Sequence, residues 1–204
     1  MLSITVIIVI ITSGFSLLCF TNKNYFEKSL FIPYRIKNDK EYWRLFTHMF
    51  AHGDEMHLIF NMLSFYSFGE MIEQTFVMQY GYVLGKSLFV VLYFGAGLFA
   101  EIYPYYRNKN NITYRSLGAS GAVSAIIFSF IMMNPTAELS LFFLPIPMPA
   151  IAFGVIYLGF EIYAHKQNKS GIAHDAHIGG AIFGILFTVI LFPQVVQDLI
   201  NMIF

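Results

Sequence analysis

Charge is the scarcest property of this sequence. Only 12% of its 204 residues are Asp, Glu, Lys or Arg, against about 25% in soluble domains, whereas 57% are hydrophobic. The formal net charge is zero, so the composition gives no sign of a nucleic-acid partner. The shortage of charge predicts that this chain lies in the lipid bilayer.

Cysteine is also nearly absent. Cys19 is the single one, which excludes a disulfide within the chain. No Lys or Arg precedes Lys23, and no small-residue cleavage site follows the first apolar run. We therefore expect that run to stay as a membrane helix rather than to be removed as a signal peptide.

Long apolar runs are abundant. A helix needs about 20 apolar residues to cross the hydrocarbon core of a bilayer. Six segments qualify or come close: residues 3–20, 56–74, 81–102, 118–133, 146–164 and 176–192. The sequence therefore predicts an all-α, polytopic membrane protein with six transmembrane helices, in which residues 1–204 form a single domain.

The connections between these segments are unequal. In the longest, residues 21–55, the stretch KEYWRLFTHMF (40–50) places its large apolar residues on one helical face and Arg44 away from it. This pattern is typical of a short helix in the membrane interface, with Trp43 near the headgroups. The proline-rich segment LPIPMPA (144–150) predicts the break between the fourth and fifth helices.

Polar side chains inside the predicted spans are functional candidates, because burial in lipid is costly unless they are paired. His57 and Asn61 are four residues apart and therefore share one face of segment 56–74. A hydrogen bond between helices would explain this pair about as well as a functional site would.

Small residues would allow two of the predicted helices to touch. Gly180 and Gly184 have the small-xxx-small spacing of close helix contacts, and Gly118 and Gly121 offer a matching surface on segment 118–133. A serine hydroxyl and an imidazole on different helices meet at about 3 Å only where the backbones nearly touch. These glycines permit that approach.

Ser120 and His177 stand at the starts of these two segments, so they can lie at one depth. A serine is a poor nucleophile until an adjacent base takes its proton. Attack on a peptide carbonyl creates an oxyanion, which needs preorganised donors. We expect Ser120 to be the nucleophile and to donate its backbone N–H, His177 to be the base, and His57 with Asn61 to be the side-chain donors.

This ordered set resembles the rhomboid family of intramembrane serine proteases. The resemblance rests on Trp43-Arg44, HMFAHGDEMHLIFN (48–61), GASG (118–121) and AHIGGAIFG (176–184), in family order. It implies a Ser120–His177 catalytic dyad, with His57 and Asn61 at the oxyanion hole. It also implies cleavage of transmembrane segments of other membrane proteins, without a metal or cofactor.

Two features depart from the family pattern or are missing. Family members have an aromatic residue one turn after the nucleophile that stacks on the catalytic histidine, and Ser124 occupies that position here. The orientation of the imidazole must then come from other packing. No third carboxylate is evident, because Asp175 is two residues before His177, where we predict that it caps the last helix.

The resemblance implies a bacterial cytoplasmic membrane, with the active site opening to the extracytoplasmic side. Lys and Arg concentrate in the odd-numbered connections, and by the positive-inside rule this would place those connections in the cytoplasm, the opposite orientation. We follow the resemblance. The first connection is expected to be a folded interfacial element, and this weakens the charge of its basic residues as a signal of orientation. The resemblance further implies that helices 56–74 and 146–164 part to admit substrate.

Two other readings stay open. Two clusters of His and acidic residues hold plausible ligand types for a metal-dependent protease or transporter. The eight residues are His48, His52, Asp54, Glu55, His57, His174, Asp175 and His177. HGDEMH is not the H-E-x-x-H motif, however, and a metal site would leave Ser120 without a task. A non-catalytic relative that binds membrane helices is the second alternative, although such relatives lose the dyad residues.

Overall fold

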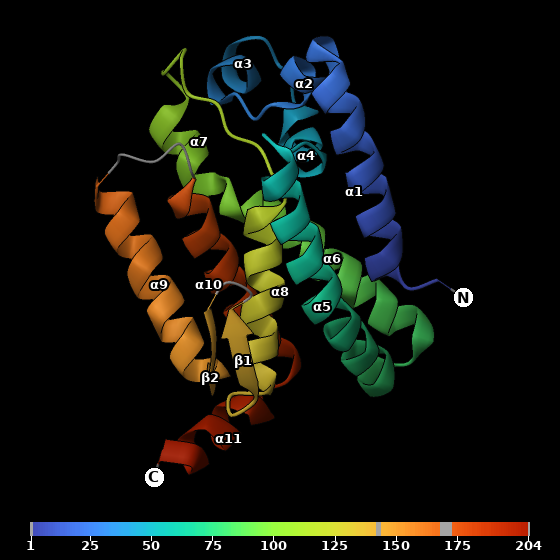
Figure 1. Ribbon diagram of the computed structural model, residues 1–204, viewed down its shortest axis with the longest axis vertical. Helices are drawn as coiled ribbons and strands as arrows, with labels where there is room; N and C mark the ends of the chain where they lie inside the picture. The colour runs from blue at the N-terminus through green and yellow to red at the C-terminus, as the bar shows by residue number, and fades with distance from the viewer. Residues whose placement is uncertain (1, 142–143, 168–172, 204) are drawn as a thin grey trace.

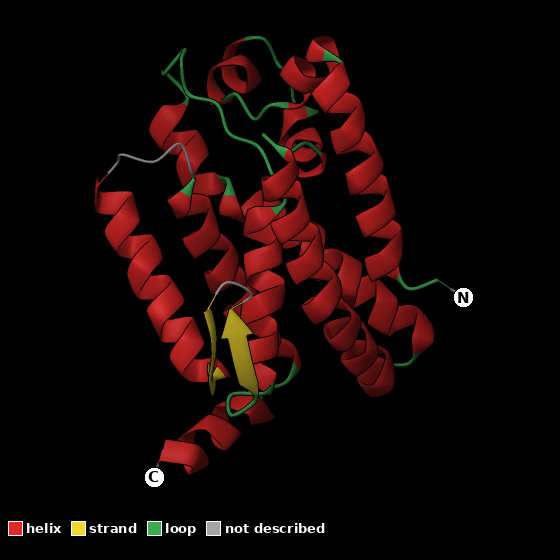
Figure 2. Ribbon diagram, viewed as in Figure 1, coloured by secondary structure: helices red, strands yellow, loops and turns green. Residues whose placement is uncertain are grey.

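The computed structural model describes residues 2–141, 144–167 and 173–203, and most of them are helical (Figures 1 and 2). Six longer helices lie side by side: α1 (Ile4–Thr21), α5 (Glu55–Tyr80), α6 (Tyr82–Ala100), α8 (Ser120–Met133), α9 (Ala150–Gln167) and α10 (His174–Leu191). Short helices flank them: α2 (Lys23–Ser29), α3 (Pro33–Asn38), α4 (Arg44–Thr47), η1 (His48–Phe50), α7 (Ile102–Asn108) and α11 (Gln194–Ile203).

A short β-hairpin is added to the otherwise all-α fold. Strands β1 (Glu138–Leu141) and β2 (Leu144–Pro149) pair antiparallel, with Glu138 opposite Pro149. The fifth long helix consequently begins at Ala150 and not at residue 146. The three prolines of β2 explain the shift, because proline lacks the amide N–H and its ring clashes inside a helix, whereas a two-stranded hairpin tolerates it at an edge.

The outer surface of the helices is apolar, as expected of a membrane protein. Val83, Val155 and Ile190 are between 67% and 78% exposed, and large apolar surfaces of this kind mark contact with lipid or protein. Within the described residues, three stretches are long and apolar enough to cross a membrane: Ile4–Thr21, Tyr82–Asn108 and His174–Leu191. Helix α8 is apolar but shorter, so the count of six spans remains a prediction.

Consecutive long helices run in opposite directions, so α5, α8 and α10 all begin toward the same end of the molecule (Figure 1). Helix α8 lies centrally, with α10 and α9 on one side of it and α5 on the other (Figure 1). The residues at the starts of these three helices are thereby brought to one depth. The loops from α1 to α5 gather at that same end.

The contact between α8 and α10 is made by backbone against backbone. A Cβ atom on Gly180 would overlap the carbonyl oxygen of Gly121, and one on Gly184 would overlap that of Ala125. The small residues at these positions therefore bring the two helix axes closer than side chains would allow. The prediction that glycines permit close approach of these two segments agrees with this packing.

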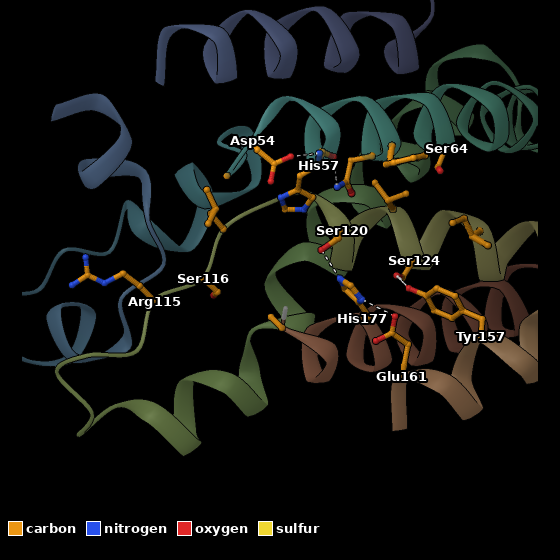
Figure 3. Close-up of a pocket in the computed structure, with 17 residues that line it drawn as sticks. Asp54, His57, Ser64, Arg115, Ser116, Ser120, Ser124, Tyr157, Glu161 and His177 are labelled. Atoms are coloured by element: carbon orange, nitrogen blue, oxygen red, sulfur yellow. Dashed lines mark hydrogen bonds and ion pairs between the residues drawn. The ribbon is translucent and has the colours of Figure 1, made fainter. Parts of the chain in front are cut away.

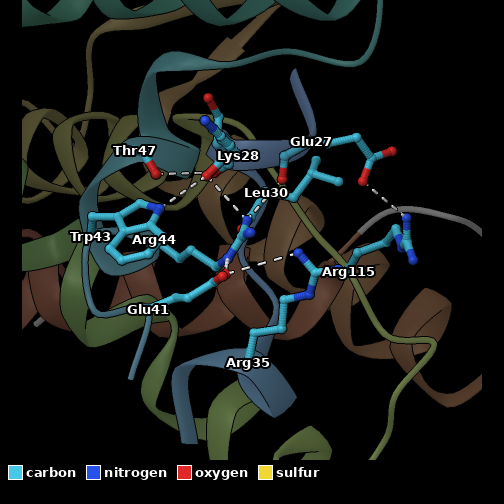
Figure 4. Close-up of polar contacts among 10 residues, drawn as sticks. Glu27, Lys28, Leu30, Arg35, Glu41, Trp43, Arg44, Thr47 and Arg115 are labelled. Carbon is cyan, nitrogen blue, oxygen red and sulfur yellow. Dashed lines mark hydrogen bonds and ion pairs between the residues drawn. The ribbon is translucent and has the colours of Figure 1, made fainter. Parts of the chain in front are cut away.

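The first loop is held together by Arg44, whose side chain is only 1% exposed (Figure 4). Its Nη1 atom donates to the carbonyl oxygens of Glu27 at 2.8 Å, Lys28 at 3.1 Å and Leu30 at 2.8 Å, and its Nε atom pairs with Glu41 at 2.5 Å. The last carbonyls of α2 have no partner within their own helix, so one guanidinium satisfies them together.

The prediction that residues 40–50 form an interfacial helix with one apolar face is wrong in part. Trp43 and Phe46 are about half exposed, as an interfacial helix requires, but Met49 is buried against Gly97. Arg44, which the pattern placed away from the apolar face, points into the protein. The helix is also short and ends in the 3₁₀ turn His48–Phe50.

Candidate active site

Ser120 is the first residue of α8. The turn that leads into it depends on Gly118, which has φ of +115°, a value that side-chain-bearing residues rarely adopt. A Cβ atom there would also lie 2.9 Å from Cε1 of His57. The Gly118 N–H donates to the His48 carbonyl at 2.9 Å, which ties this turn to the first loop.

His177 lies in the first turn of α10, and its Nε2 atom is 2.7 Å from Ser120 Oγ (Figure 3). The two residues come from positions 57 apart in the chain. The glycine contact between α8 and α10 makes this distance possible, because it leaves no room for longer side chains between the helices. Both side chains line a cavity of about 600 Å³.

Glu161 of α9 lies on the other side of His177, as Figure 3 shows. Its Oε1 atom is 3.0 Å from His177 Nδ1, and its Oε2 atom is 2.5 Å from Nδ1 of His174. An ionised carboxylate only accepts hydrogen bonds, so this contact favours the His177 tautomer that carries its proton on Nδ1 and has a lone pair on Nε2. The lone pair faces the hydroxyl of Ser120.

Glu161 corrects the expectation that no third carboxylate is present. Asp175 does not cap α10 either: the helix begins at His174 with Ala173 as its N-cap, and Asp175 accepts from the neighbouring N–H of Ala176 at 3.1 Å. A signal for Glu161 was available, because an acid within an apolar span is a functional candidate by default. Its pairing with His177 depends on how α9 packs, which residue spacing does not reveal.

Ser124 shows what replaces the missing aromatic residue. Its Oγ atom is 2.9 Å from the hydroxyl of Tyr157 on α9. A tyrosine thus approaches the cavity from α9 instead of from α8, one helical turn before Glu161 on the same face. The contact on His177 from this helix is made by the Glu161 carboxylate.

His57 and Asn61 lie along the opposite wall of the cavity, on α5. Asp54 caps this helix by accepting from the His57 N–H at 2.8 Å. Asn61 Nδ2 donates to the His57 carbonyl at 2.9 Å, and since an amide nitrogen carries two hydrogens, one donor remains. The structure therefore places both side chains where they can donate into the cavity shared with Ser120.

His48 and His52 lie apart from the Ser120–His177 pair. Burial lowers the pKa of His48 to about 4. Burial, reinforced by nearby His57, lowers the pKa of His52 to about 3, although Asp54 acts in the other direction. Both imidazoles are neutral at neutral pH, and His52 Nδ1 lies 2.9 Å from Ser16 Oγ. The His52 contact ties the first loop to α1, and the ring of His48 packs against Phe31 of the first loop.

A metal site would need a different set of ligands from the one considered in the sequence analysis. Within the described ranges, one group of His and acidic side chains has its ligand atoms within 4.8 Å of one another: Glu161, His174 and His177. It lacks every predicted ligand of the first loop, and it includes a glutamate that was not predicted. The His177 nitrogen in this group is Nδ1, so Nε2 still faces Ser120.

Comparison with known proteins gives a family match over most of the chain. The model of the family described as "Rhomboid domain" matches residues 39–194. RHOMBOID-like protein 12, mitochondrial, of Arabidopsis thaliana is 34% identical over 152 residues, covering 67% of this chain and 43% of that protein. Rhomboid protein 1, mitochondrial, of Saccharomyces cerevisiae is 28% identical over 141 residues, covering 68% of this chain and 38% of that protein.

A bacterial relative is named as a protease. Rhomboid protease AarA of Providencia stuartii is 27% identical over 177 residues, covering 79% of this chain and 60% of that protein. The chain thus spans between 38% and 60% of the length of these three relatives.

Proposed function

Because the chain belongs to the rhomboid family, we propose that it is an intramembrane serine endopeptidase. Its substrates are other membrane proteins, cleaved at peptide bonds in or near their transmembrane segments. The observation that carries this proposal is the 2.7 Å contact between Ser120 Oγ and His177 Nε2 at the edge of a cavity between apolar helices. The name of a relative such as Rhomboid protease AarA supports the protease reading.

The reaction begins when Ser120 Oγ attacks the substrate carbonyl carbon and its proton passes to His177 Nε2. The carbonyl oxygen becomes an oxyanion, which accepts hydrogen bonds from the Ser120 N–H and from the side chains of His57 and Asn61. The Ser120 N–H is free for this role because the first N–H groups of a helix have no partner within it.

Collapse of this intermediate breaks the peptide bond. The leaving amine takes the proton from His177 Nε2, and the acyl group stays on Ser120 as an ester. Water then attacks the ester while His177 again accepts a proton, and release of the carboxylic acid product restores Ser120. No metal or cofactor is needed at any step, because the chain supplies nucleophile, base and oxyanion donors.

The protein is an integral membrane protein, but the comparisons do not support the prediction of a bacterial cytoplasmic membrane. Relatives from Arabidopsis thaliana and Saccharomyces cerevisiae are named as mitochondrial, whereas the AarA protease is bacterial. We propose that residues 1–204 act as one domain, with the cavity mouth on the side where the first loop lies.

The test is cleavage of a model transmembrane substrate by purified protein in proteoliposomes. Ser120→Ala and His177→Ala are each expected to abolish cleavage, and a fluorophosphonate probe should label the parent but not Ser120→Ala. The matched control is Ser129→Ala, which changes a buried serine of the same helix that bonds to the Gly184 carbonyl. Cleavage retained by Ser120→Ala, or lost by the parent in EDTA, would favour the metal reading.

A further inference from the structure

We propose that Glu161 is the positioning residue of the base His177, and that His174 fixes the Glu161 carboxylate from its far side. The proposal rests on the serine protease function given above. It turns the expected pair of catalytic residues into a chain of four groups: hydroxyl, imidazole, carboxylate, imidazole. The third and fourth of these groups are new.

The geometry of the carboxylate supports this role. Each oxygen of Glu161 has its own imidazole partner, with Oε1 at 3.0 Å from His177 Nδ1 and Oε2 at 2.5 Å from His174 Nδ1. Two donors on opposite oxygens fix the plane of the carboxylate, and this in turn fixes the ring of His177. Hydrogen bonds to an ionised group are about twice as strong as neutral ones.

Burial makes the contact selective for one arrangement of protons. Glu161 is 4% exposed and His174 is 5% exposed, and a buried carboxylate is costly without donors. His177 can satisfy it only by keeping its proton on Nδ1. The lone pair on Nε2 is then available to Ser120 in the resting enzyme, and the carboxylate stabilises the imidazolium that forms when the proton arrives.

A purely structural link between α9 and α10 would need only the Glu161–His174 contact. The additional contact reaches His177 on the ring atom opposite the one that faces Ser120, so the carboxylate also acts on the proposed base. The absence of an aromatic residue at Ser124 adds to this, since the ring has lost the restraint that the family pattern supplies. The Glu161 carboxylate provides another restraint on the His177 ring.

The experiment compares Glu161→Gln with Glu161→Asp by steady-state cleavage in proteoliposomes. The glutamine amide can donate to Nδ1 and so favour the wrong tautomer. We expect kcat to fall at least tenfold, with the loss of about 10⁴ for the corresponding change in a soluble protease as the ceiling. KM should stay near its parent value, and Glu161→Asp should retain more of kcat because it keeps the charge.

The control is Glu101→Gln, which replaces another buried acidic side chain near a histidine with its amide, with His48 Nδ1 at 3.9 Å from Glu101. It is expected to leave kcat within twofold of the parent. ¹⁵N spectra of histidine-labelled protein provide a readout independent of turnover. The parent should show His177 protonated on Nδ1, and Glu161→Gln should lose this signature while its other histidine signals stay in place.

Three outcomes would overturn the proposal. Parent-like kcat in Glu161→Gln, in a preparation where Ser120→Ala is inactive, would remove Glu161 from the site and leave the protease function intact. If Glu161→Gln keeps the ¹⁵N signal of His177 but loses thermal stability, Glu161 is only a structural link between α9 and α10. Loss of parent cleavage in EDTA with recovery on added zinc would make Glu161, His174 and His177 a metal site.

Discussion

Helix α10 has two neighbours on the active-site side, and it contacts them in opposite ways. Against α8 the contact is backbone to backbone, where Gly180 and Gly184 meet the carbonyl oxygens of Gly121 and Ala125. Against α9 the polar contact is made by long side chains, with Glu161 reaching across to two histidines of α10. The outer face of α9 is open, and Phe160 and Tyr163 are more than half exposed.

A nucleophile and its base need a short distance between them and a fixed orientation of the base, and the two contacts of α10 serve these needs separately. The close α8–α10 contact sets the distance between Ser120 and His177, because backbone atoms cannot yield. The α9 contact sets the orientation of the imidazole, through side chains that can adjust. We therefore expect substitutions in the first contact to destroy the site and substitutions in the second to reduce its rate.

The largest effect is expected for Gly180→Ala. Overpacking a core costs about 1–3 kcal/mol where side chains can shift, and here the obstacle is the Gly121 carbonyl oxygen, so we expect at least the upper end of that range. Unfolding in detergent with increasing SDS measures the loss, and cleavage should fall with it. Gly159→Ala is the control on α9, where a Cβ atom would meet nothing within 4 Å.

Gly159→Ala should be neutral or stabilising by up to about 1 kcal/mol, because alanine favours a helix more than glycine does. Equal destabilisation by the two substitutions would contradict the difference between the two contacts.

Asn61→Ala is expected to have the next largest effect, from the wall of the cavity formed by α5. Removing one oxyanion donor in a soluble protease costs about 10²–10³ in kcat, and His57 with the Ser120 N–H would remain. Steady-state kinetics should show the loss in kcat with folding unchanged. Asn108→Ala is a matched control, because Asn108 also donates to the carbonyl four residues earlier. Parent-like turnover would remove Asn61 from the site.

The smallest effect is expected for Tyr157→Phe, which breaks the hydrogen bond to Ser124 but keeps the ring. Such bonds between membrane helices average about 0.6 kcal/mol, so kcat should fall less than about tenfold. Tyr163→Phe changes an exposed tyrosine of α9 and serves as the control. A loss as large as that of Glu161→Gln would mean that Tyr157 acts directly on the reaction.

The parts of the molecule that could be predicted from the sequence are those set by local pattern. The apolar runs located the long helices, and the spacing of Gly180 and Gly184 indicated a close helix contact. The predicted helix 146–164 begins too early, because Pro147 and Pro149 lie in strand β2. The prolines predicted a break in the helix, but not that the chain would pair with Glu138–Leu141.

The parts that were missed depend on contacts between distant side chains and backbone. Arg44 is buried because it satisfies carbonyl oxygens at the end of α2, and carbonyls are the same in every residue, so no sequence pattern marks them. Glu161 meets His177 only because α9 turns that face toward α10. The acid itself was visible in the sequence, but its partner was not.

The side-chain contact between α9 and the proposed base has a consequence for inhibitors. If the proposed reaction is right, a compound need not react with Ser120 to stop it, because moving α9 outward would withdraw Glu161 from His177. The way in is the outer face of α9, where Val155, Ile156 and Phe160 are exposed. If α9 is one of the six predicted spans, a lipophilic ligand at that face would not affect soluble serine hydrolases, which have no such helix to displace.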